Sequence, residues 1–130
     1  MSFGLAEHFT GDKRNKIIKS HFDVLKKGGI SFISVPNKYC LPYRVWKYLS
    51  EKKGVWQFGT EYPFSRGELK RITKHFTKKS SIFGGGMLKS LRLLSPFKKK
   101  YDKNENPRSE FITPFDKYLG NYLFLVGIKK

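Results

Sequence analysis

The segment from residue 38 to residue 64 holds the groups best suited to contact a ligand. Aromatic and cationic side chains alternate there: Tyr39, Tyr43, Trp46 and Tyr48 with Lys38, Arg44 and Lys47. Aromatic rings beside cations can stack on nucleic-acid bases, and they can also cover a bound substrate. The alternative without a ligand is a packed cap over the edge of a sheet.

Three consecutive glycines, Gly84 to Gly86, stand between an expected strand and an expected helix. A loop that cradles a phosphate at a helix N-terminus occupies the same position. The dinucleotide fingerprint requires another glycine three residues later, where this sequence has Lys89. We therefore interpret the glycines mainly as a turn, with anion binding as the less favoured alternative.

The histidines and the cysteine suggest neither a metal site nor a catalytic group. His8, His21 and His75 fit no metal-ligand spacing, and no Ser-His-Asp arrangement can be recognised. We expect no metal, and the catalytic residue stays unassigned. Cys40 is the only cysteine, which favours a reducing, cytoplasmic location.

The composition indicates one folded domain with a strongly basic surface. The 130 residues are 38% hydrophobic and 16% aromatic, which excludes a disordered chain. A formal net charge of +17 favours anionic partners such as nucleic acid, although a solvated lysine-rich surface explains the same excess. No stretch is long and apolar enough to span a membrane, and we expect a mobile basic loop at residues 96–110.

The segment "LKKGGISFISVPN" predicts a helix, a turn, a strand and a loop in immediate succession. Apolar residues recur at helical spacing over residues 12–27, and Gly28-Gly29 ends this helix. Residues 30–35 are typical of a strand covered on both faces. Pro36 has no N–H for a sheet ladder and ends the strand. Ligands of α/β sheets lie beyond the carboxyl ends of strands, so Asn37 opens a functional loop.

The start of another helix is marked by two local signals. Ser65 and Glu68 have the spacing of a capping box, and Phe64 and Leu69 that of a hydrophobic staple. Together they predict a helix over residues 66–76.

The remaining elements follow from shorter patterns. Val45, Trp46 and Leu49 predict the apolar side of a short helix that ends before Gly54. "KKSSIFGGG" predicts a strand, "MLKSLRLL" a short helix and "FITPFDKYLG" a helical turn. The final "NYLFLVGIK" predicts a strand buried on both faces.

The order of these segments resembles that of class I S-adenosylmethionine-dependent methyltransferases. Glu7-His8 is similar to the small-residue-Glu-His segment after the family's fourth strand. Leu25 to Gly29 resembles the Leu-Lys-Pro-Gly-Gly element before strand five, with Lys27 in place of proline. "TEYPFSRGEL" resembles the stretch before the helix that precedes strand six, and "YLGNYLFLVGIKK" the last, antiparallel strand.

The resemblance implies an α/β fold, with a partial Rossmann-like methyltransferase sheet of strands five, six and seven and flanking helices. The family's strands lie in the order three, two, one, four, five, seven, six, and the last is antiparallel. Residues 1–130 would be a single domain, the C-terminal, substrate-side portion of the enzyme. The family's glycine-rich cofactor loop and acidic ribose ligand precede the Glu-His segment. We therefore expect a fragment or split subunit that is inactive alone.

The resemblance also implies roles for individual residues in transferring a methyl group to an unknown acceptor. The expected contacts to the cofactor, S-adenosylmethionine, are Phe3, Gly4, Leu5 and His8. The expected contacts to the substrate are Asn37, Tyr39, Tyr43, Trp46 and Glu61. No catalytic base is implied, because positioning two substrates can suffice. Without the glycine-rich loop, the isolated chain should bind the cofactor weakly or not at all.

Two kinds of partner are expected. The strand at 30–35 would lie at a sheet edge, which favours pairing with an amino-terminal methyltransferase half or with a second copy of the chain. The alternative function is a small basic module that binds RNA or another polyanion without catalysis. Salt-dependent binding of nucleic acid would favour that alternative.

Overall fold

The computed structural model describes residues 2–94 and 113–130, and the expected basic loop at 96–110 lies outside them. The strands are β1 (Ser2–Phe3), β2 (Ile30–Pro36), β3 (Thr77–Gly85) and β4 (Tyr122–Lys129). The helices are the 3-10 turn η1 (Ala6–His8), α1 (Gly11–Asp23), α2 (Leu41–Lys52), α3 (Arg66–Thr73), α4 (Met87–Leu94) and α5 (Asp116–Leu119). The mixed α/β class predicted from the sequence is confirmed.

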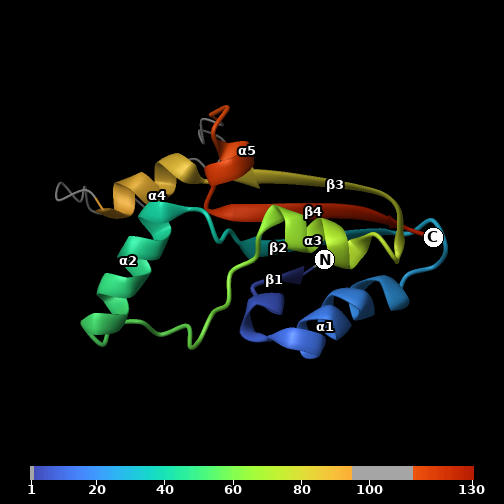
Figure 1. The fold of residues 1–130 in the computed structure, drawn as a ribbon, viewed down its shortest axis with the longest axis horizontal. Coiled ribbons are helices and arrows are strands. Elements are labelled where there is room, and N and C mark those ends of the chain that lie inside the picture. Colours follow the sequence, from blue (N-terminus) through green and yellow to red (C-terminus); the bar gives the residue numbers. More distant parts are fainter. Residues whose placement is uncertain (1, 95–112) are drawn as a thin grey trace, which may run out of the picture.

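The four strands lie side by side in the order β1-β2-β4-β3 (Figure 1). β1 is parallel to β2, whereas β4 is antiparallel to both of its neighbours. Leu125 of β4 lies opposite Ile33 of β2 on one side and Ile82 of β3 on the other. The last strand of the chain therefore holds the two longer strands before it together.

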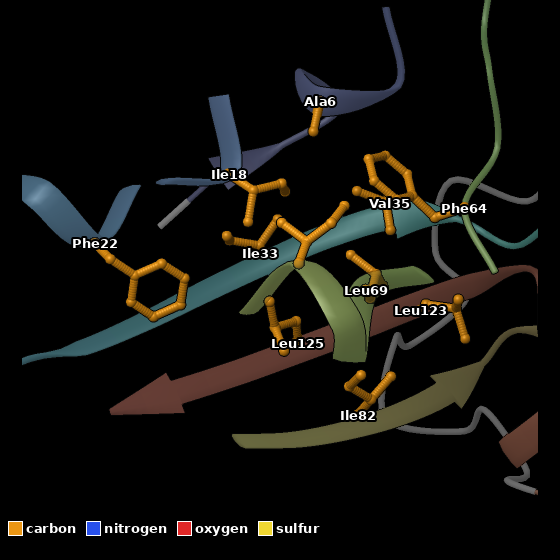
Figure 2. Close-up of a cluster of buried hydrophobic side chains, with 11 residues drawn as sticks. Ala6, Ile18, Phe22, Ile33, Val35, Phe64, Leu69, Ile82, Leu123 and Leu125 are labelled. Carbon is orange, nitrogen blue, oxygen red and sulfur yellow. The ribbon is translucent and has the colours of Figure 1, made fainter. Parts of the chain in front are cut away.

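The hydrophobic core lies between the sheet and helices α1 and α3 (Figure 2). Ile18 and Phe22 of α1 and Leu69 of α3 pack on Ile33 and Leu125 of the sheet. These side chains share one face of the sheet because side chains alternate along a strand. Figure 1 shows α2, α4 and α5 at the end of the sheet where β2 and β3 finish.

The opposite face of the sheet is only partly covered. Leu123 and Leu125 are buried, but Phe124 and Val126, which alternate with them along β4, are half-buried. The prediction that the last strand is buried on both faces is therefore wrong. The rings of Phe83 and Phe124 stack there with centroids 5.3 Å apart. On the same face of β2, Ile30 is exposed and Phe32 half-buried, whereas Ser34 and Pro36 are buried, so the predicted cover on both faces holds only for the end of that strand.

α1 ends at Asp23, four residues earlier than predicted. The ammonium of Lys129 donates hydrogen bonds to the carbonyls of Asp23 (3.0 Å) and Leu25 (2.7 Å), which the end of the helix leaves without helical partners. Gly28 has φ +81° and its N–H donates to the Lys129 carbonyl (3.2 Å). The double glycine therefore leads the chain into β2 and does not end α1.

α2 presents a different face to the protein than predicted. Val45 and Leu49 are 47% and 44% exposed, whereas Tyr43 and Lys47 are buried. Burial of Lys47 is tolerated because its ammonium lies 3.9 Å from the Glu61 carboxylate. A charged residue thus takes a buried position that periodicity assigns to apolar ones.

The predicted start of α3 is confirmed in detail. The Glu68 N–H donates to Ser65 Oγ (3.1 Å), and the Ser65 N–H donates to the Glu68 carboxylate (3.5 Å). Phe64 and Leu69 are fully buried in the same core. The helix ends at Thr73, so the predicted end at residue 76 is three residues too late.

Removing the α3 cap should weaken the fold. Ser65→Ala leaves the Glu68 N–H without its acceptor and should lower the free energy of unfolding by about 1 kcal/mol. Ser80→Ala, on an exposed position of β3, should change it by less than about 0.5 kcal/mol. Urea denaturation of both variants checks this, and equal midpoints would contradict the role of the cap.

The two edges of the sheet differ in how they are protected. The β3 edge carries the exposed cations Lys78 and Lys79, which discourage pairing with another strand. On the other side, β1 covers only Ile33 and Ser34 of β2. Association with another chain is therefore expected at the β1–β2 edge.

We expect the chain to self-associate, more strongly at high salt because salt screens its +17 charge. Light scattering after size exclusion at low and high salt measures this. Ile30→Lys should favour the monomer, whereas Ser81→Lys on β3 should not. A strict monomer of the unmodified chain at both salt concentrations would contradict an open edge at β2.

Candidate functional site

A pocket of about 600 Å³ lies at the carboxyl ends of β1 and β2. Its lining comes from η1 and the residue after β1, from the end of β2, from α2 and the loop that follows it, and from the start of β4. The volume falls within the range of small-molecule sites, about 300–1,000 Å³. Segments far apart in the sequence therefore meet at one cavity.

One wall of the pocket is aromatic. Trp56 packs edge-on against Trp46 (centroids 5.6 Å apart) and Phe58 (5.2 Å), and Tyr43 lies 5.9 Å from Trp46. The Lys47 ammonium lies 5.2 Å from the centre of the Trp56 ring. The wall is suited to a flat or apolar ligand, and Trp56 already contacts one cation of the protein.

Hydrogen bonds fasten the loop that carries this wall to η1 and α1. The Trp56 indole N–H donates to the Gly59 carbonyl (2.8 Å), and the Tyr62 N–H donates to the Glu7 carbonyl (2.7 Å). Arg14 of α1 donates to the Tyr62 carbonyl (2.8 Å). The aromatic wall is thereby held against the residues that follow β1.

Two carboxylates reach the pocket in different environments. Glu61 accepts a hydrogen bond from the Tyr43 hydroxyl (3.1 Å) and lies near the Lys47 ammonium. Glu7 is only 5% exposed, and its Oε2 has no hydrogen-bond partner among the described residues. Burial raises the pKa of Glu7 above its ordinary value of 4.5. A hydrogen bond from its own backbone N–H and the charges of His8 and Arg14 oppose this rise, and the Glu61 charge adds to it. Burial and the neighbouring Glu61 also raise the pKa of the Tyr43 hydroxyl, which therefore stays a donor.

Asn121 adds another acceptor from the far end of the chain. Its Oδ1 is buried without a partner in the described part of the chain. Asn37 holds this segment in place: its Nδ2 donates to the carbonyls of Tyr118 (2.9 Å) and Gly120 (2.8 Å), and its N–H donates to the Asn121 carbonyl (2.8 Å). Asn37 thus fixes the backbone that brings Asn121 to the pocket.

Some of the residues predicted to form the site come together. Tyr43, Trp46 and Glu61 of the expected substrate contacts line the pocket, and so does Gly4 of the expected cofactor contacts. The segments before and after β2 are therefore neighbours, as a shared site requires. Their roles in binding stay predictions.

The other predicted site residues lie elsewhere. Asn37 is buried behind the pocket and uses its side chain on backbone groups. Tyr39 is 55% exposed and is not part of the lining. Leu5 is exposed, and His8 lies at the surface, where its Nδ1 bonds the Thr60 carbonyl (3.0 Å). Phe3 belongs to β1, next to Gly4.

Among the pocket residues that were missed as site residues from the sequence are Glu7, Trp56, Phe58 and Asn121. Glu7 stands in the same Glu-His segment as His8, and the two aromatic residues lie in the segment from residue 38 to residue 64, so a signal was present for these three. Asn121 had no local signal, because the pairing of β4 brings it to the site.

The triple glycine serves packing. A Cβ on Gly84 would lie 1.9 Å from the Asp116 carbonyl oxygen, so only glycine allows α5 to lie this close to β3. The Asp116 carboxylate accepts hydrogen bonds from the N–H groups of Met87 (2.8 Å) and Thr113 (2.6 Å). An anion of the protein itself thus occupies the start of α4, where a phosphate would have to sit.

No three side chains of His, Cys, Asp or Glu gather as metal ligands within residues 2–94 and 113–130. In the same part of the chain, every helix is too short or too polar to cross a membrane.

No family model, curated protein or solved structure matches this chain. Functional interpretation therefore depends on the pocket and on the order of the strands.

The buried charge of Glu7 should reduce stability at neutral pH. Because its folded-state pKa is raised, the folded protein holds a proton on Glu7 more tightly than the unfolded chain does. Glu7→Gln should therefore raise the denaturation midpoint at pH 7. The gain should shrink as pH falls through the raised pKa and vanish below 4.5, where Glu7 is protonated in both states.

Asp12→Asn provides the control, because Asp12 is exposed in the first turn of α1, outside the pocket. It should not stabilise the protein at pH 7, since a negative charge there favours the helix. If Glu7→Gln gave no gain, or a gain that did not depend on pH, Glu7 would not be a buried, partnerless carboxylate.

Proposed function

We propose that this chain forms the acceptor side of a class I S-adenosylmethionine-dependent methyltransferase. The observation that carries the proposal is the strand order β1-β2-β4-β3, with β4 antiparallel. The family's strands four, five, seven and six have the same order and directions. Consecutive strands usually lie next to each other. Here β2 and β3 are consecutive but are separated by the final, antiparallel strand β4, and this insertion is a specific feature.

The place of the Glu-His segment supports the same proposal. Glu7 and His8 lie in η1, directly after the strand that would be the family's fourth. Gly4, between that strand and η1, lines the pocket. Ligands of open α/β sheets bind beyond the carboxyl ends of the strands, so this segment is suitably placed to border cofactor and acceptor.

The residues present fit only one edge of a cofactor site. Of the expected cofactor contacts only Gly4 lines the pocket, and its φ of +69° suits glycine. Bound S-adenosylmethionine would supply an electrophilic methyl group. The chain's own contribution is to hold the acceptor: Trp46 and Trp56 exclude water, and Glu61 with Tyr43 orients polar groups.

The polyanion-binding alternative draws its support from the charge of +17. The pocket does not favour it, because Glu7 and Glu61 would repel an anion there. Binding of RNA would therefore have to use the exposed lysines, such as Lys78 and Lys79 on β3.

Methyl transfer should require the chain together with a cofactor-binding half. The test uses the tagged chain purified with its associated proteins from its source cells, supplied with methyl-labelled S-adenosylmethionine. The complex should transfer label, whereas the chain alone should bind the cofactor with a Kd above about 1 mM, equivalent to about −4 kcal/mol. Micromolar binding by the chain alone, or no transfer by the complex, would contradict the proposal.

In the active complex, Trp46→Ala should raise the KM for the acceptor about tenfold, the effect of losing about 1.4 kcal/mol of contact. Tyr39→Ala is the matched control, because Tyr39 is exposed and outside the pocket. Unchanged kcat and KM in Trp46→Ala would show that the aromatic wall is only structural packing.

A further inference from the structure

Two side-chain oxygens of pocket residues are shielded from water and have no hydrogen-bond donor among the described residues. Glu7 is 5% and Asn121 is 3% exposed, and Glu7 Oε2 and Asn121 Oδ1 accept no hydrogen bond from residues 2–94 or 113–130. A buried acceptor without a donor costs about 1–3 kcal/mol, and a charged one costs more. The two residues lie at opposite ends of the chain and line the same cavity. Their shared feature is a need for hydrogen-bond donors.

The cations around this cavity make their close contacts with groups other than the Glu7 carboxylate, although His8 and Arg14 act on it from beyond ion-pair distance. The Lys47 ammonium is engaged with Glu61 (carbonyl 3.3 Å, carboxylate 3.9 Å) and with Glu51 (3.4 Å). Arg14 pairs with Glu68 (3.3 Å). Within the described residues, Glu7 has no ion-pair partner inside 4 Å. The missing donor is therefore best supplied as a cation.

The rest of the cavity is apolar. Trp46, Trp56 and Phe58 form a wall, and the volume of about 600 Å³ admits a ring with a short side chain. The net charge of +17 attracts anions from a distance, but an anion in this cavity would meet two carboxylates. A ligand that combines a cationic end with a flat, apolar body satisfies both parts of the cavity.

We propose that this pocket binds a small primary amine carried on an aromatic body. Its ammonium donates hydrogen bonds to the Glu7 carboxylate and the Asn121 amide oxygen, and its ring packs against the aromatic wall. Binding of the amine follows from the pocket alone. Its identification as the methyl acceptor rests on the proposed function, and then makes the chain part of an amine N-methyltransferase.

Binding is tested with the full chain, without cofactor, by tryptophan fluorescence and calorimetry. The probes are 2-phenylethylamine, the neutral 2-phenylethanol and the anionic 3-phenylpropionate, which share ring and chain length. The amine should bind at least about tenfold more tightly than the alcohol, because a hydrogen bond to a charged group contributes about 1.5–3 kcal/mol. The acid should bind most weakly.

Glu7→Gln should remove the preference for the amine, and Asp12→Asn should keep it. Asn121→Ala, on a different element, should weaken amine binding at least about threefold, which gives a second readout if Glu7→Gln folds poorly. Equal affinity for the three probes, or an amine preference that survives Glu7→Gln, overturns the inference. Amine binding by the chain without methyl transfer by the complex would contradict the proposed function and leave this inference intact.

Discussion

The sheet depends on the last strand of the chain lying between two strands formed earlier. β4 pairs with β2 over seven residues on one side and with β3 on the other. α1 packs closely on the sheet at Gly127 of β4, since a Cβ there would lie 2.9 Å from the Phe22 ring. Without β4, neither β2 nor β3 has its main neighbour, and the core under α1 and α3 loses Leu123 and Leu125.

The position of β4 between β2 and β3 also builds the pocket. The chain enters β4 through Gly120, where a Cβ would lie 2.5 Å from the Gly85 N atom, so the backbone can pass this point only as glycine. Asn37, directly after β2, then ties the entering segment to β2 through two side-chain hydrogen bonds. Asn121 lines the same cavity as Glu7 as a result. The pairing of β4 therefore completes both the sheet and the pocket.

Features that depend on neighbours in sequence were predictable. The capping box of Ser65 and Glu68 needs partners only three residues apart, and its geometry follows from spacing alone. The end of α1 was not predictable, because its carbonyls are satisfied by Lys129 from the other end of the chain. The buried face of α2 likewise depends on Glu61, which allows Lys47 to be buried.

The site likewise contains features that depend on neighbours in sequence and features that depend on distant parts of the chain. The aromatic wall could be predicted from the segment after residue 38, whereas Asn121 becomes a neighbour of Glu7 only through the register of β4. The sequence also left an anion site at the triple glycine open, as the less favoured alternative to a turn. Asp116, some thirty residues later in the chain, occupies that position instead.

The central claim is that the pocket keeps the Glu7 carboxyl group buried, with its Oε2 lacking a hydrogen-bond donor among the described residues until a ligand supplies one. The most direct measurement is a carbon-13 NMR titration of the side-chain carboxyl of Glu7, assigned by comparison with Glu7→Gln. The account predicts a pKa above 4.5 in the free protein and a lower pKa when an amine is bound. A pKa at or below 4.5 in the free protein would show that Glu7 has a donor or meets water, and would contradict the account.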